Sequence, residues 1–194
     1  GSFYTPREIV NYMVDESLIA YFKGKTDIDE EDIRLLFQYT DEKHKLSTSQ
    51  IEELINAIYE CKILDPACGS GAFPMGVLQQ LVHILKKVDP ENYHWKKVQN
   101  ENATKEIQKA LDIEDRKERE NRLIEINNAF DVKKNRPDYA RKLYIIENCI
   151  YGVDIQPIAI QISKLRFFIS LVVDQKNKYE DENFGIIPLP NLET

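Results

Sequence analysis

The stretch that decides the fold is Ile63-Leu64-Asp65-Pro66-Ala67-Cys68-Gly69-Ser70-Gly71-Ala72-Phe73. Its apolar start ends in the acid Asp65, a turn with two glycines follows, and apolar residues at helical spacing begin at Phe73. This order predicts a strand from Cys61 to Asp65, then a loop and a helix. Gly69 and Gly71 have no Cβ, so they can adopt positive φ and let a ligand lie against the backbone. Ligands of open α/β sheets bind beyond the carboxyl ends of the strands, which is where Asp65 would stand.

The loop differs from the common phosphate-binding loops. A dinucleotide-binding loop has a third glycine where this chain has Pro74, and the Lys-Ser/Thr pair of a P-loop is absent. An acid at the end of the strand would repel a pyrophosphate, whereas it suits a cationic ligand. The loop taken alone leaves two interpretations open: a ligand site, or a turn that only caps the following helix.

A second strand is predicted from Cys149 to Asp154, and it also ends in an acid. Gln156-Pro157 then starts a long helix with an apolar stripe made by Ile158, Ile162, Leu165, Ile169 and Val172. Parallel strands bring their carboxyl ends to one edge of a sheet, so the two aspartates are expected to meet there. The Asp154 carboxylate could accept hydrogen bonds from both hydroxyls of a ribose, or it could cap the helix that follows.

The rest of the chain is predicted to be largely helical. Thr5-Pro6-Arg7-Glu8 has the pattern of an N-cap, a first-turn proline and a capping box, for a helix that runs to about Phe22. A further capping box is predicted at Ser49-Gln50-Ile51-Glu52. We divide the chain into an N-terminal helical segment, 1–60, and a partial α/β core, 61–194. Mixed charges with sparse apolar residues indicate a helical insertion at about 92–137.

Composition limits the function classes. The 194 residues carry a net charge of −7, which argues against this chain being a major DNA-gripping surface, because phosphate contacts need Lys and Arg. The three cysteines are widely spaced and form no zinc or disulfide pattern, which favours a reducing cytoplasm and gives no metal site. No signal peptide or membrane span is recognised, so no membrane partner is expected.

With its flanks, the stretch from Asp65 to Phe73 resembles motif I of the S-adenosylmethionine-dependent N6-adenine DNA methyltransferases of restriction-modification systems. Phe3-Tyr4-Thr5-Pro6-Arg7-Glu8-Ile9-Val10 resembles the motif that precedes motif I in this group. Asn148-Cys149-Ile150-Tyr151-Gly152-Val153-Asp154-Ile155-Gln156-Pro157 resembles motif II. The resemblance implies an α/β fold with a Rossmann-like methyltransferase core, of which this chain holds part of the sheet.

The resemblance also implies roles for individual residues. Asp154 would bind the ribose of S-adenosylmethionine, Ile155 would pack on its adenine, and Asp65 would face its methionine end. Capping and cofactor contact are compatible for Thr5 and Pro6, at the entrance of the site. The full set of implied cofactor-binding residues is Tyr4, Thr5, Pro6, Asp65, Pro66, Ala67, Gly69, Gly71, Phe73, Asp154 and Ile155.

The chain departs from the family pattern where the chemistry would occur. The family holds the target base with the motif Asn/Asp-Pro-Pro-Tyr/Phe. The most similar segment of this chain, Pro188-Leu189-Pro190-Asn191, does not match that motif, so no catalytic residue is assigned. We therefore expect a cofactor-binding portion that is inactive alone, with double-stranded DNA bound through parts of a longer protein outside this chain. Single-chain type IIG restriction enzymes are the nearest likeness, because Tyr151-Gly152-Val153-Asp154-Ile155 followed by Lys164-Leu165-Arg166 resembles them. A type I modification subunit and a non-catalytic helical adaptor with a vestigial pocket are the alternatives.

Overall fold

The computed structural model describes residues 5–40, 42–124 and 137–173, and it pairs two short strands in parallel. β1 (Ile63–Asp65) lies beside β2 (Ile150–Gly152), with Ile63 opposite Ile150 and Asp65 opposite Gly152. Both strands were predicted, but each is shorter than the sequence indicates. Cys61 still belongs to the end of the preceding helix, and Cys149 N still donates to the carbonyl of Ile145. Helical hydrogen bonding therefore takes the first residues of each expected strand. β2 also ends at Gly152, so the expectation that this strand reaches Asp154 is wrong.

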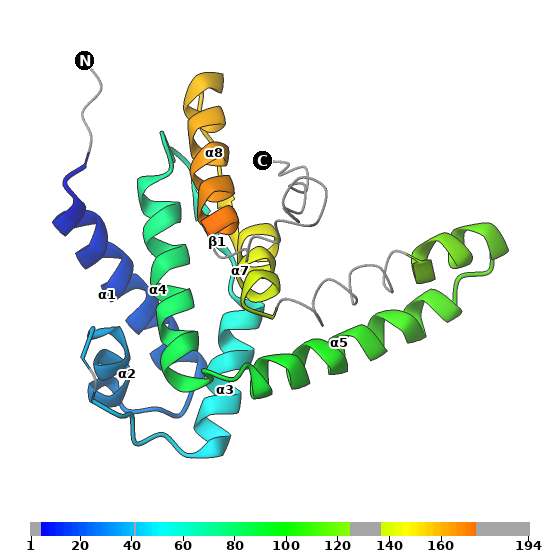
Figure 1. The fold of residues 1–194 in the computed structure, drawn as a ribbon, viewed down its shortest axis with the longest axis horizontal. Coiled ribbons are helices and arrows are strands. Elements are labelled where there is room, and N and C mark those ends of the chain that lie inside the picture. Colours follow the sequence, from blue (N-terminus) through cyan, green and yellow to red (C-terminus); the bar gives the residue numbers. More distant parts are fainter. Residues whose placement is uncertain (1–4, 41, 125–136, 174–194) are drawn as a thin grey trace, which may run out of the picture.

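Helices surround this small sheet (Figure 1). Before and after β1 the chain forms α1 (Arg7–Lys25), α2 (Glu30–Phe37), α3 (Thr48–Glu60) and α4 (Ala72–Val88). The remaining labelled helices are α5 (Tyr93–Leu111), α7 (Pro137–Asn148) and α8 (Pro157–Val173). α1 packs most extensively on α4, and one hydrophobic cluster joins side chains of α1 to α5, α7, β2 and α8. The N-terminal helical segment thus shares its core with the rest of the chain, while the Rossmann-like architecture stays a prediction.

The start of α1 differs from the sequence-based prediction. The N-cap is Pro6, not Thr5, and no side-chain hydrogen bond caps the helix, so the expected capping box with Glu8 is wrong. Pro6 has an extended backbone (φ −55°, ψ 142°), and its carbonyl accepts from the backbone N of Ile9 and of Val10. The helix also continues past Phe22, and Lys25 is its last residue.

The capping box of α3 lies two residues before the predicted one. The Ser47 hydroxyl accepts from Gln50 N at 3.3 Å, and the Gln50 carboxamide accepts from Ser47 N at 3.0 Å. Ser49, the predicted cap, lies inside the first turn and is exposed. Both serines precede a Gln or Glu at the required spacing, so the motif alone could not select between them.

Replacing Ser47 with alanine should destabilise the protein by ~1 kcal/mol, because the first turn of α3 loses the oxygen that accepts from Gln50 N. Ser49→Ala is the matched control and should change the free energy of unfolding by less than about 0.5 kcal/mol. Urea unfolding followed by circular dichroism measures both. Equal losses for the two variants would contradict the assignment of the cap.

The predicted insertion packs against the other helices at its start and extends away from them farther along the chain. The buried Asp89 carboxylate accepts from the backbone N of Tyr93, His94 and Trp95, which fixes the first turn of α5. The Trp95 side chain is buried and packs against Tyr59. Farther along, α5 extends away from the other helices, and residues 116–124 form another helical stretch (Figure 1). The predicted insertion extended to 137, but residues 125–136 lie outside the described part.

α8 forms where the sequence predicts a helix, but it is rotated from the expected orientation. The predicted apolar stripe is mostly exposed, whereas the buried positions are Ser163, Phe167 and Leu171. These three residues are spaced by four and lie on one face of the helix. The exposed residues of the stripe are Ile158, Ile162, Leu165 and Ile169.

No helix in the described ranges is both long enough and apolar enough to cross a bilayer. The sequence also predicts an extended segment from Phe184 to Pro190, and that segment lies outside the described residues.

Candidate functional site

Asp65 ends β1, whereas Asp154 lies two residues after the end of β2, and the loops that follow the two strands are bonded to each other. Beyond the last strand pair, Val153 N donates to the Asp65 carbonyl at 2.9 Å. Cys68 N, in the glycine loop, donates to the Val153 carbonyl at 3.0 Å. The backbone therefore continues the pairing of β1 and β2 into the two loops. The predicted meeting of Asp65 and Asp154 at one edge agrees with this arrangement.

Asp154 links the two loops through its side chain. Its Oδ2 accepts from Gly69 N at 2.9 Å, and its Oδ1 accepts from Gln156 N at 2.8 Å. The bond to Gln156 is an Asx-turn two residues on, and α8 begins only at Pro157, so Asp154 is not the N-cap of that helix. Because a carboxylate has about four acceptor positions, the side chain retains capacity for further donors.

Asp65 has one satisfied oxygen and one unsatisfied oxygen. Its Oδ1 accepts from Ala67 N at 3.1 Å, which tightens the turn after β1. Its Oδ2 is buried and has no hydrogen-bond partner among the described residues. A buried acceptor without a donor is unfavourable, so a ligand that brings a donor or a positive charge to this oxygen would remove the penalty.

The two glycines of the loop have positive φ, as the sequence predicts, but their surroundings differ. Gly69 has φ +53°, and an added Cβ would meet nothing within 4 Å, so its surface is open to a ligand. Gly71 has φ +81°, and an added Cβ would lie 2.3 Å from the Ser163 Oγ of α8. Gly69 therefore fits the expected approach of a ligand, whereas Gly71 is required by the close packing of α8.

The other residues predicted to bind the cofactor differ in their placement. Pro66 and Ala67 are exposed, and Phe73 packs on the core and lines a groove of about 460 Å³ between β1, α1 and α4. Ile155 is 97% exposed, immediately after Asp154. Thr5 and Pro6 are exposed before α1, neither forms a hydrogen bond with the glycine loop among the described residues, and Tyr4 lies outside them. The role of this N-terminal motif at the site stays a prediction.

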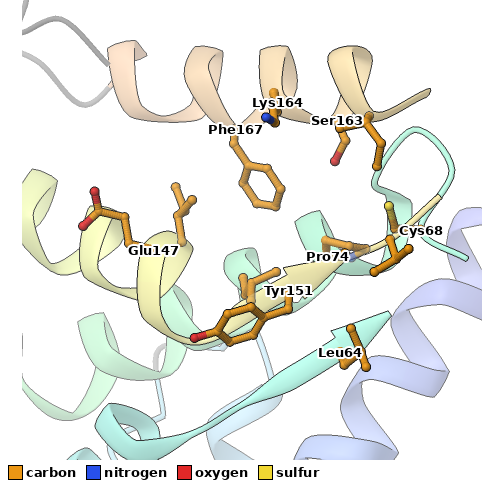
Figure 2. Close-up of a pocket in the computed structure, with 13 residues that line it drawn as sticks. Leu64, Cys68, Pro74, Glu147, Tyr151, Ser163, Lys164 and Phe167 are labelled. Atoms are coloured by element: carbon orange, nitrogen blue, oxygen red, sulfur yellow. The ribbon is translucent and has the colours of Figure 1, made fainter. Parts of the chain in front are cut away.

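A second cavity, of about 470 Å³, lies on the α8 side of the sheet (Figure 2). Figure 2 shows Phe167 and Ser163 directed from α8 toward β2 and the glycine loop, with Cys68 and Pro74 on the loop side. Sequence reasoning did not place Ser163 at the site, and it used Arg166 only within Lys164-Leu165-Arg166, as part of the family resemblance. In the structure the Arg166 Nη1 donates to the Ser70 carbonyl at 2.9 Å. No local sequence pattern predicts that Ser163 and Arg166 contact the glycine loop, because these contacts depend on how α8 is rotated.

The Cys68 thiol is buried within the site. Burial raises its pKa, and the carboxylates of Asp65 and Asp154 raise it further. A raised pKa means less thiolate at neutral pH, and thiolate is the reactive form. The sequence left open a reactive thiol or a small residue filling the turn, and this environment favours the second.

We expect all three cysteines to resist 5,5′-dithiobis(2-nitrobenzoate) at pH 8 in the folded protein, because burial raises each thiol pKa, that of Cys149 to about 12. All three should react rapidly in guanidinium chloride, which serves as the control. Absorbance at 412 nm gives the rates. Rapid release of one equivalent from the folded protein, lost in Cys68→Ser, would show that the loop thiol is reactive.

Comparisons with known proteins give one informative match. No protein-family model matches the chain, and no solved structure matches it. A curated protein of Methanocaldococcus jannaschii, provisionally named a type II restriction enzyme and methyltransferase, is 26% identical over 202 aligned residues. The alignment covers 100% of this chain and 14% of that protein. The chain is therefore similar over its whole length to a methyltransferase of a restriction-modification system.

Proposed function

We propose that this chain is the S-adenosylmethionine-binding portion of a site-specific DNA adenine-N6 methyltransferase of a restriction-modification system. In this proposal β1 and β2 are two strands of a larger Rossmann-like sheet, and the glycine loop and Asp154 hold the cofactor at its edge. The chain spans 14% of the length of its curated relative, and our proposal assigns the transfer itself to a longer protein.

The observation that carries the proposal is the bridge made by Asp154. One carboxylate connects the glycine loop after β1 to the loop after β2, through Gly69 N and Gln156 N. It thus stands between the loop that would receive the methionine end of the cofactor and Ile155, which would contact the adenine. Its remaining acceptor capacity suits two ribose hydroxyls.

The residues present fit this cofactor chemically. The unpaired Asp65 Oδ2 suits the ammonium or sulfonium of the methionine end, because both carry positive charge. α4 begins at the glycine loop without a side-chain cap, and the positive end of its dipole suits the carboxylate. Gly69 leaves room for the cofactor to lie on the backbone. When bound, the cofactor supplies an activated methyl group on its sulfonium.

We propose adenine N6 as the target for two reasons. The first is the motif I sequence Asp65-Pro66-Ala67-Cys68-Gly69, and the second is its position between the two flanking motifs. An adenine inside a duplex must be flipped out before its amino group can be reached. With a net charge of −7, this chain is poorly suited to hold the duplex, so we assign DNA binding to other parts of the longer protein. We favour a type IIG-like single chain, since the relative's name combines restriction and methylation.

Isothermal titration calorimetry of the 194-residue chain tests the cofactor assignment. We expect saturable one-to-one binding of S-adenosylmethionine and of S-adenosylhomocysteine, and none of NAD. A chain that is folded by circular dichroism but binds neither compound at millimolar concentration would contradict the assignment and favour the helical adaptor. For a longer protein that contains this chain, transfer of labelled methyl to N6 of adenine in duplex DNA tests the target, and methylated cytosine would overturn it.

A further inference from the structure

The glycine loop is held from two directions. On the strand side, Cys68 N bonds to the Val153 carbonyl and Gly69 N bonds to the Asp154 carboxylate. On the helix side, Arg166 donates to the Ser70 carbonyl. The strand side belongs to the site already described, whereas the helix side has no role in it.

The contact with α8 is close. Ser163 is 7% exposed, and its Oγ lies 2.3 Å from the position that a Cβ of Gly71 would take, so the loop backbone packs directly on the helix. Arg166 follows Ser163 by three residues and therefore lies on the same side of α8. Together the two side chains contact consecutive loop residues, Ser70 and Gly71.

The Arg166 bond fixes the direction of one peptide plane. With the Ser70 carbonyl directed at the guanidinium, the following N–H, that of Gly71, donates to the Cys68 carbonyl at 2.8 Å. The same peptide leads into the uncapped start of α4, where Gly71 is the N-cap. The orientation of this peptide therefore sets where the first backbone N–H groups of α4 are aimed.

We infer that Arg166 is a positioning residue for the cofactor: it holds the Ser70–Gly71 peptide so that the glycine loop is ordered before the cofactor binds. This inference rests on the proposed function. A loop already in its bound conformation loses less conformational entropy on binding, and affinity rises accordingly. Arg166 need not touch the cofactor for this effect.

The test compares Arg166→Ala with Arg166→Lys in the full 194-residue chain. Arg166→Ala should weaken S-adenosylmethionine binding by about tenfold, since it removes a hydrogen bond from a charged donor. Lysine can also donate to the Ser70 carbonyl, so Arg166→Lys should recover affinity to within about threefold of the unmodified chain. Arg116→Ala is the matched control, because Arg116 is an exposed arginine of the insertion that pairs with Glu120.

Hydrogen exchange without cofactor separates this inference from the proposed function. The amides of Gly69 and Gly71 should exchange about tenfold faster in Arg166→Ala, while those inside α4 stay as protected as before. If the unmodified chain binds no S-adenosylmethionine, the proposed function fails, and the exchange result still decides whether Arg166 orders the loop. Unchanged loop exchange, or equal affinity of Arg166→Ala and the unmodified chain, would overturn the inference. A lysine variant as weak as the alanine variant would also overturn it.

Discussion

Replacing Asp154 with alanine is expected to weaken S-adenosylmethionine binding by about 100-fold or more, which is the largest functional effect we predict. Two losses combine. The cofactor would lose the acceptor for its ribose hydroxyls, and the glycine loop would lose the carboxylate that binds Gly69 N and Gln156 N. Isothermal titration calorimetry of the variant against S-adenosylmethionine measures the change.

Two further variants make this prediction specific. Glu114→Ala removes the same charge from an exposed position in the insertion and should bind with unchanged affinity. Asp154→Asn keeps one acceptor oxygen but places an amide donor opposite the second N–H, so its affinity should fall between those of Asp154→Ala and the unmodified chain. If Asp154→Ala binds as tightly as Glu114→Ala, the carboxylate does not serve the cofactor.

Replacing Gly71 with alanine should produce the largest loss of stability, about 3 kcal/mol or more. The new Cβ would lie 2.3 Å from the Ser163 Oγ, and a residue with a side chain is strained at φ +81°. Gly69→Ala introduces only the backbone strain, at φ +53°, and should lower the free energy of unfolding by about 1–2 kcal/mol. Urea unfolding gives both values.

A double-mutant cycle isolates the contact with α8. Ser163→Ala removes the Oγ and leaves the Ser163 Cβ at 3.1 Å, so Gly71→Ala should be less damaging in that background. Gly69→Ala should cost the same with and without Ser163→Ala, because nothing lies within 4 Å of its Cβ position. Strictly additive effects of Gly71→Ala and Ser163→Ala would contradict the packing of α8 on the loop.

The sequence predicts the parts of this site that obey general rules. A short apolar run that ends in an acid and is followed by a helix occurs twice, with a glycine loop only after the first acid, and parallel pairing brings the two ends together. The positive φ of Gly69 and Gly71 follows from the tight turn. The bond from Asp154 to Gly69 N could not be predicted, because it depends on the exact separation of the two loops.

The errors have physical causes of their own. α8 is apolar on more than one face, so its spacing pattern does not define a single buried side, and the stripe from Ile158 to Ile169 was assigned to the wrong one. The cap of α3 differs from the predicted one because Ser49 satisfies the motif as well as Ser47 does. In α1 the motif at Thr5 is present in the sequence but not used, since the helix starts after Pro6 without a side-chain cap. Lys164-Leu165-Arg166 contributes to the family resemblance, but the bond from Arg166 to the glycine loop could not be predicted, since its partner is a backbone carbonyl that the sequence cannot specify.

The partners Gly69 and Asp154 are 85 residues apart in the sequence, which has a consequence for folding. Helices α1 to α4 can pack through nearer contacts, whereas β2 must close a long loop before it adds its acid to the edge of β1. Completion of the site should therefore be a late folding event. Closure entropy grows only with the logarithm of loop length, so doubling the intervening segment would cost only about 0.6 kcal/mol more. Related chains can therefore differ greatly in the length of the insertion that contains α5, with little loss of stability.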